Sequence, residues 1–208
     1  MILTLRLKIV LLLPLISFGG KLLGQENKLN DSIIYIQEVA IETNKKSKVA
    51  KATTLGTHKE IRGFNKADSK YVSLVRNIPK GQLVSICFFF SPGMLNKNSE
   101  FDLGLLMFEL DENGKPGRAL SDKETKFKLK ANGKGKIKLD LRKLYLNSKE
   151  ELFFGFAIYN DITRNPLLVK FSIAKGATSF YQELKSDWLS PVGDPVQLQL
   201  VVEIDPDN

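Results

Sequence analysis

Cysteine, histidine and tryptophan each occur only once in the 208 residues of this chain. With Cys87 alone, no internal disulfide can form, and one histidine plus one cysteine cannot complete a structural zinc site. The sequence also has no G-x-S-x-G motif to carry a hydrolase nucleophile. Its Gly-rich basic stretch, Asn132–Lys136, lacks the P-loop spacing and reads as a turn. We therefore predict no metal site and no cofactor.

Long apolar runs are scarce, and this argues against a transmembrane helix in the mature chain. The run Ile9–Phe18 is shorter than the roughly 20 residues that a span needs, and Pro14 interrupts it. Two basic residues precede the run, and small residues follow it as far as Gly24. This order is typical of a secretory signal peptide, residues 1–24, with an uncleaved membrane anchor as the alternative. We expect export to the periplasm or to the outer-membrane or extracellular side.

Acidic residues are only slightly fewer than basic ones. Without Arg6, Lys8 and Lys21 of the predicted signal peptide, the chain keeps 28 basic residues against 23 acidic ones, a net charge of +5. Such a charge favours weak contact with anionic surfaces. It is too diffuse to indicate nucleic-acid binding, so no nucleic-acid partner is predicted.

Strand patterns dominate the rest of the chain, and no stretch convincingly predicts a helix. Three stretches are apolar on both faces of a strand, which is typical of strands covered on both sides: Leu83–Phe90, Phe101–Leu110 and Leu152–Tyr159. Further strands are predicted at Tyr71–Ile78, Lys123–Lys130, Lys136–Leu141, Leu167–Ala174 and Pro195–Ile204. About nine strands, roughly 8 to 15 residues apart, predict an all-β fold: an antiparallel β-sandwich, jelly-roll-like.

Two turns are marked by glycine and asparagine. Asp111–Gly114 is predicted to end the central strand as a tight turn rather than a calcium loop, because it lacks the alternating acidic spacing of such loops. Asn132–Gly135 is predicted to join Lys123–Lys130 and Lys136–Leu141 as a β-hairpin.

The chain divides into three parts: the signal peptide, 1–24, a strand-forming segment with a basic linker, 25–47, and the β-sandwich, 48–205. Ile33–Glu42 is rich in β-branched residues, and four lysines follow it closely. Ile33–Glu42 either adds a strand to the domain or presents a free strand to a partner protein. The lysines are expected to form a solvated linker, with contact to an acidic envelope surface as the alternative.

No candidate catalytic residue has the partners that it would need. His58 is predicted to lie in a surface loop, and Cys87 to be an unreactive thiol buried in the core. Ser172 and Lys175 match S-x-x-K, but they fall at the end of a strand rather than at the start of a helix. We therefore predict that the protein is not an enzyme.

The stretch Lys175–Pro191 is the best candidate for ligand binding. It combines aromatic rings with polar side chains, as a wet apolar contact such as a sugar site requires. The predicted ligand-binding residues are Tyr181, Asp187 and Trp188. The alternative is that Phe180 and Trp188 pin this long connection to the core.

Several motifs are shared with a known group of proteins: IQEVAIE (Ile36–Glu42), LGTHKEIRGF (Leu55–Phe64), FELDENGKPGRAL (Phe108–Leu120), IKLDLRKLYL (Ile137–Leu146) and LFFGFAIY (Leu152–Tyr159). With these motifs the chain resembles uncharacterised exported carboxypeptidase-regulatory-like-domain proteins of Bacteroidetes type. It matches their C-terminal β-sandwich portion, and the regulatory-like domain is expected to be missing. The resemblance implies an envelope protein of unknown activity and offers no catalytic residues.

IQEVAIE is also similar to the short segment that TonB-dependent outer-membrane receptors present to their energising partner. Together, these features favour an exported cell-envelope β-sandwich that is a non-enzymatic binding or interaction module. A carbohydrate-binding accessory protein and a hydrolase with an unrecognised site are the alternatives. The expected partners are an envelope protein or a glycan.

Overall fold

The computed structural model describes residues 34–35, 49–56, 58–91, 100–121, 124–130, 135–160, 162, 166–184 and 186–206. The predicted signal peptide lies outside these residues, as does most of the predicted segment 25–47. Within the described residues, no helix is long and apolar enough to cross a membrane.

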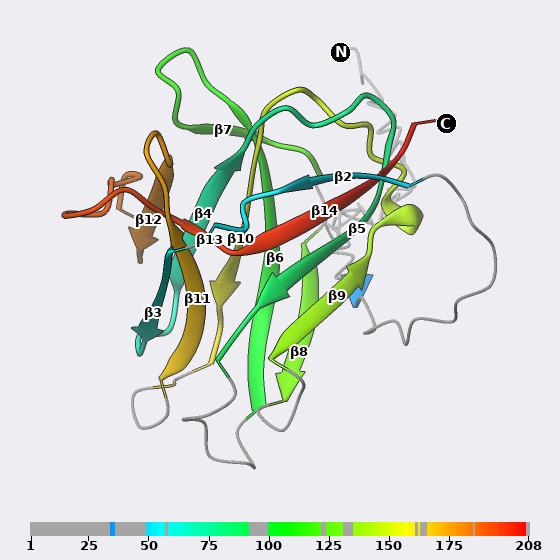
Figure 1. Cartoon of the computed structure of the whole chain (residues 1–208). Coiled ribbons are helices and arrows are strands. Elements are labelled where there is room, and N and C mark those ends of the chain that lie inside the picture. The colour runs from blue at the N-terminus through cyan, green and yellow to red at the C-terminus, as the bar shows by residue number, and fades with distance from the viewer. Residues whose placement is uncertain are drawn as a thin grey trace, which may run out of the picture. The chain divides into compact units, whose positions relative to one another are not determined.

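The fold is an all-β antiparallel sandwich, and a short 3-10 turn lies at Arg142–Leu144 (Figure 1). The first layer is a sheet in the order β1-β8-β6-β10-β4-β12, with β7 added to β6. Its strands are β1 (Ile34–Tyr35), β4 (Ser69–Val75), β6 (Glu100–Leu110), β7 (Pro116–Ala119), β8 (Thr125–Lys130), β10 (Leu152–Ile158) and β12 (Ser179–Glu183). All its pairings are antiparallel except that of β1 with β8.

The second layer consists of two smaller sheets, ordered β2-β14-β5-β9 and β13-β11-β3. Their strands are β2 (Ala50–Thr53), β3 (His58–Phe64), β5 (Gln82–Phe89), β9 (Lys136–Asp140), β11 (Leu167–Ile173), β13 (Val196–Leu198) and β14 (Leu200–Asp205). In Figure 1, β2, β14, β5 and β9 run diagonally across the strands of the first layer.

Gln199 divides the second layer, and it splits the predicted single strand Pro195–Ile204 into β13 and β14. Its backbone N–H donates to the carbonyl of Lys170 at 2.9 Å, and its side-chain amide donates to the carbonyl of Phe171 at 3.2 Å. Its own carbonyl accepts from Phe89 at 3.3 Å. The apolar pattern predicted one strand because it does not reveal that the strand changes partners halfway.

The chain crosses between the two layers at most of its connections, as it does in a jelly roll. From β4 onward it alternates layers, except that β6, β7 and β8 share the first layer and β13 and β14 share the second. The predicted hairpin of Lys123–Lys130 and Lys136–Leu141 is therefore wrong: β8 pairs with β6 and β1, whereas β9 pairs with β5. Phe127 of β8 and Leu139 of β9 enter the same core from opposite layers.

The three strands predicted to be buried do lie at the centre of the layers. All seven residues of β10 are buried, and β10 and β6 are neighbours in the middle of the first layer. In β6 and β5 one face is buried, whereas Leu106, Phe108, Cys87 and Phe89 on the other face are only partly covered. The prediction of central strands is confirmed, but complete burial of both faces holds only for β10.

A second, smaller hydrophobic cluster covers the outer face of the first layer. It contains buried Val72, Leu74, Phe153 and Phe180, with Phe108 and Trp188 packed against them. The rings of Phe108 and Trp188 meet edge to face, with their centroids 5.6 Å apart. This cluster fastens the connection that follows β12 to the sheet.

The predicted turn at Asp111–Gly114 is confirmed. One carboxylate oxygen of Asp111 accepts hydrogen bonds from the backbone N–H groups of Asn113, at 2.8 Å, and Lys115, at 2.7 Å. Gly114 has a φ of 72°, a conformation that favours glycine. The Asp111 carboxylate thus shapes the turn that leads into β7.

Candidate functional site

The described residues assemble no catalytic or metal-binding group around the candidates named from sequence. His58 is exposed at the start of β3, so the prediction that it lies in a loop is wrong. The Ser172 side chain is buried in β11, and its hydroxyl accepts a hydrogen bond from the backbone of Gly56 at 2.9 Å. No three His, Cys, Asp or Glu side chains within the described ranges converge as metal ligands would.

Cys87 does not lie in the core as predicted. Its neighbours Ile86 and Phe88 point into the core, so Cys87 faces the other side of β5 and is only half-buried. Partial burial raises the pKa of its thiol, although Lys136 and Lys138 act in the opposite direction. A thiol with a raised pKa is a poor nucleophile, which agrees with the predicted lack of reactivity.

Glu203 forms the densest polar contact on this outer face of the second layer. Its carboxylate accepts hydrogen bonds from Lys138, at 2.5 Å, and from the Ser85 hydroxyl, at 2.8 Å, and Lys51 lies 3.5 Å away. Burial alone would raise the pKa of this carboxyl, but these hydrogen bonds outweigh burial and hold the pKa below its usual value of 4.5. The Glu203 carboxylate thus links β14 to β5, β9 and β2, and its role is structural.

This contact predicts a pH dependence of stability. Because the pKa of Glu203 is lower in the folded state, the carboxylate stabilises the fold above about pH 4.5, and this stabilisation is lost as pH falls through the folded-state pKa. We expect the free energy of unfolding to fall less between about pH 7 and about pH 3 in Glu203→Gln than in the wild type. Urea titrations at both pH values measure this, and equal losses would contradict it.

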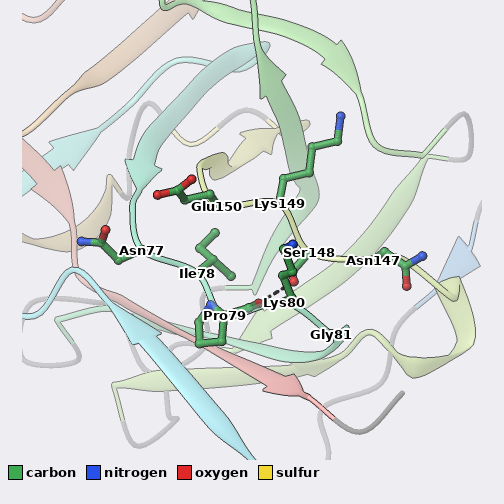
Figure 2. A pocket seen from close by; sticks show the side chains of 9 residues that line it. All are labelled: Asn77, Ile78, Pro79, Lys80, Gly81, Asn147, Ser148, Lys149 and Glu150. Carbon is green, nitrogen blue, oxygen red and sulfur yellow. Dashed lines mark hydrogen bonds between the residues drawn. The ribbon is translucent and has the colours of Figure 1, made fainter.

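A cavity of about 900 Å³ lies between the connections 77–81 and 147–150 (Figure 2). Its polar groups serve the loops themselves: the Ser148 hydroxyl donates to the carbonyl of Pro79 at 2.6 Å, and Lys149 is paired with Glu109 at 2.8 Å. Figure 2 shows the polar ends of Asn77, Asn147 and Lys149 spread apart rather than converging. No aromatic residue lines this cavity, so we interpret it as a packing gap between two loops rather than as a ligand site.

A better candidate is the groove where both layers end, which we call the edge groove. Here β3 is the last strand of the second layer, and β12 is the last strand of the first. The groove has a volume of about 360 Å³, within the range of about 300–1,000 Å³ typical of ligand pockets. Its lining includes Arg62, Phe64, Tyr71, Tyr181, Gln182 and Val192.

Aromatic rings form the apolar part of the edge groove. The rings of Phe64 and Tyr71 meet edge to face at 5.6 Å, and Tyr71 meets Phe171 in the same way at 5.1 Å. Tyr181 pairs directly with Tyr71 across β12 and β4, and its ring is half-buried against the core. These contacts form an aromatic wall in which Tyr71 is buried and Phe64 and Tyr181 are partly exposed.

A neutralised ion pair lies beside these rings. Arg62 donates to both carboxylate oxygens of Glu60, at 2.9 and 3.3 Å, and its guanidinium lies 5.8 Å from the centroid of Phe171. On the rim, Lys66 pairs with Glu183 at 2.7 Å. Apart from Lys70, the charged side chains that line the groove are therefore paired with a charge of opposite sign.

The hydroxyl of Tyr71 is the exceptional polar atom of this region. Tyr71 is only 3% exposed, and its hydroxyl has no hydrogen-bond partner among the described residues. Burial raises its pKa to about 12, although the Ser179 hydroxyl nearby has a smaller, lowering effect. That Ser179 hydroxyl already donates to the carbonyl of Val196 at 2.7 Å. The Ser179 hydroxyl is thus the polar group nearest to that of Tyr71, and a buried hydroxyl without a full hydrogen bond is costly.

The three predicted ligand-binding residues do not share one surface. Tyr181 lies in the edge groove, Trp188 packs on the outer face of the first layer, and Asp187 is exposed between them in sequence. The stretch predicted as a long connection contains β12, in which successive side chains point to opposite faces. Binding by these three residues stays a prediction.

Sequence reasoning missed Arg62 and Tyr71. Glu60, Arg62 and Phe64 alternate along β3 and so share one face, which is a signal that the sequence contains. Their position beside β12 depends on a contact between strands that are far apart in the chain. A scan against protein-family models and a search of curated proteins both find no match to this chain.

Proposed function

We propose that this protein is an exported, non-enzymatic binding module of the cell envelope, and that a glycan binds in its edge groove. The observation that carries the proposal is the Tyr181 ring, which is only partly buried where it lines the edge groove together with Arg62 and Gln182. The envelope location is supported by the signal-peptide pattern of residues 1–24 and by the resemblance to exported Bacteroidetes-type proteins.

A sugar fits this chemistry because it has both apolar faces and many hydroxyl groups. The Tyr181 ring suits a sugar face, and an amphipathic ring of this kind favours contacts that are partly wet. Arg62 and Gln182 line the groove and supply donors for hydroxyl groups, and the amide oxygen of Gln182 adds an acceptor. Because Arg62 and Glu60 already neutralise each other, a neutral glycan is favoured over a strongly charged ligand.

An envelope protein is less well supported as the ligand. The hypothesis of a free strand at Ile33–Glu42 loses support because Ile34 and Tyr35 pair with Thr125 and Lys126 of β8. This pairing favours the alternative in which the segment adds a strand to the domain. No described group of residues favours a hydrolase.

Replacing Tyr181 with alanine is expected to weaken glycan binding about tenfold, because the stacking surface is removed while the backbone pairing with β4 stays. A glycan array identifies the ligand, and calorimetry then compares the affinities of the variants. Tyr145→Ala is the matched control, because Tyr145 is 81% exposed and does not line the edge groove. Wild-type affinity in Tyr181→Ala, or equal losses in both variants, would refute the assignment of the groove.

A further inference from the structure

A second hollow lies on the outer face of the first layer, and we call it the outer hollow. It is lined by Asp68, Lys70, Ala157, Tyr159 and Leu184, and its volume is about 540 Å³. Buried Ala157 belongs to β10, and Tyr159 directly follows that strand. The hollow thus combines a small apolar residue of the sheet, an aromatic ring, a leucine, and one acidic and one basic side chain.

The two hollows meet at the same corner of the molecule. Lys70 lines both of them, and Ser69 of the edge groove directly follows Asp68 of the outer hollow. At the other strand, Glu183 of the edge groove directly precedes Leu184 of the outer hollow. The two hollows therefore adjoin at the ends of β4 and β12, where Lys70 borders both of them.

Leu184 is unusual for a residue with a structural role. It has a φ of 56°, in the left-handed region that bulky residues rarely adopt, and its side chain is 70% exposed. Such a conformation is unfavourable for a bulky side chain and tends to occur at functional sites. Leu184 lies in the turn after β12, which the Ser186 N–H closes by donating to the Glu183 carbonyl at 3.2 Å, and this turn presents its apolar side chain to solvent at the wall of the outer hollow.

Tyr159 provides an aromatic wall of the outer hollow. The ammonium group of Lys126 lies 4.8 Å from the centroid of its ring, which holds the ring in place. Gly104 of β6 makes room for this ring: a Cβ atom there would lie 2.2 Å from the Tyr159 hydroxyl oxygen. Asp68 and Lys70 add opposite charges, so this hollow too suits a neutral polar ligand.

We propose that the edge groove and the outer hollow form one continuous site for a linear, neutral oligosaccharide of several sugar units. The inference rests on the proposed function, and it adds the size of the ligand. Tyr181 contacts one sugar unit in the edge groove, and Leu184 and Tyr159 contact later units of the same chain. Affinity should therefore rise with the number of units, because each hollow adds its own contacts.

The test measures affinity against chain length by calorimetry, using cello-, xylo- and chito-oligosaccharides from one to about six units. We expect affinity to rise beyond two units in at least one series. In Leu184→Asn the gain in affinity with chain length should be about fivefold smaller, because the apolar wall is removed. Asparagine tolerates the left-handed conformation, so the backbone of the turn should be retained. Leu55→Asn is the matched control, since Leu55 is also exposed and lies in neither hollow. It should behave as the wild type does.

The outcomes separate the two proposals. If short chains bind and depend on Tyr181, but affinity does not rise with length or Leu184→Asn equals the wild type, the extended site is wrong and the proposed function stands. If no oligosaccharide binds in any series, both are wrong. Binding of an extended peptide in place of all the oligosaccharides would overturn both as well.

Discussion

Replacing Gly155 with alanine is expected to prevent the first layer from assembling. Gly155 lies in the middle of β10 and pairs with Val72 of β4 and Leu106 of β6. A Cβ atom at this position would lie 1.8 Å from the backbone oxygen of Tyr71 and 2.7 Å from the Cα of Val72. Both contacts are with backbone atoms that cannot rotate away, so β4 and β10 would have to separate. We expect a loss of at least about 3 kcal/mol in the free energy of unfolding.

Gly63→Ala is the matched control for this substitution. Gly63 lies in the edge strand β3, where a Cβ atom would meet the nearest side chain, that of Leu168, at 3.4 Å. That is an ordinary contact, so this variant should stay within about 1 kcal/mol of the wild type. Denaturant unfolding followed by the fluorescence of Trp188 measures both variants. A Gly155→Ala protein with the wild-type midpoint would contradict the described pairing of β10 with β4.

Replacing Phe156 with alanine should have the second largest effect. Phe156 is fully buried in β10, and its ring contacts those of Phe64 at 5.6 Å, Phe88 at 6.2 Å and Phe90 at 6.2 Å. These partners belong to the second layer, so this one ring joins both layers. Truncating a phenylalanine in such a site costs about 3–5 kcal/mol, because the cavity cannot close.

Phe89→Ala provides the comparison for Phe156→Ala. Phe89 ends β5, the neighbouring side chain Phe88 points into the core, and Phe89 itself is only partly buried on the outer face. Phe89→Ala should lower the free energy of unfolding by less than half as much as Phe156→Ala does, because water already reaches part of the Phe89 ring. Denaturant titrations of both variants decide this. Equal losses would mean that the contact between the layers does not depend on Phe156.

The strands and the faces they bury could be predicted from the sequence, but their neighbours could not. Alternation placed Phe127 and Ile137 on buried faces, and both are buried. The same alternation, with glycines between, suggested a hairpin, yet β8 and β9 belong to different layers. Period-two patterns report which face is apolar, and either arrangement buries the same residues.

The candidate site was only partly predictable for a related reason. Tyr181 was singled out as an aromatic residue among polar ones, and it does line a groove. Trp188 was grouped with it by proximity in sequence, but it packs on Phe108, on the outer face. Arg62 and Tyr71 reach the groove through the long-range arrangement of β3, β4 and β12, which local patterns do not encode.

The most direct test of this account is an NMR titration of the isotope-labelled protein with the oligosaccharide that binds best. We predict that the backbone amide signals of Arg62, Tyr181 and Gln182 shift together and saturate with one dissociation constant, with those of Leu184 joining them for longer chains. Signals around Ser148, at the cavity between the connections 77–81 and 147–150, should stay in place. Shifts centred on that cavity, or no saturable shifts at the edge groove, would contradict the account.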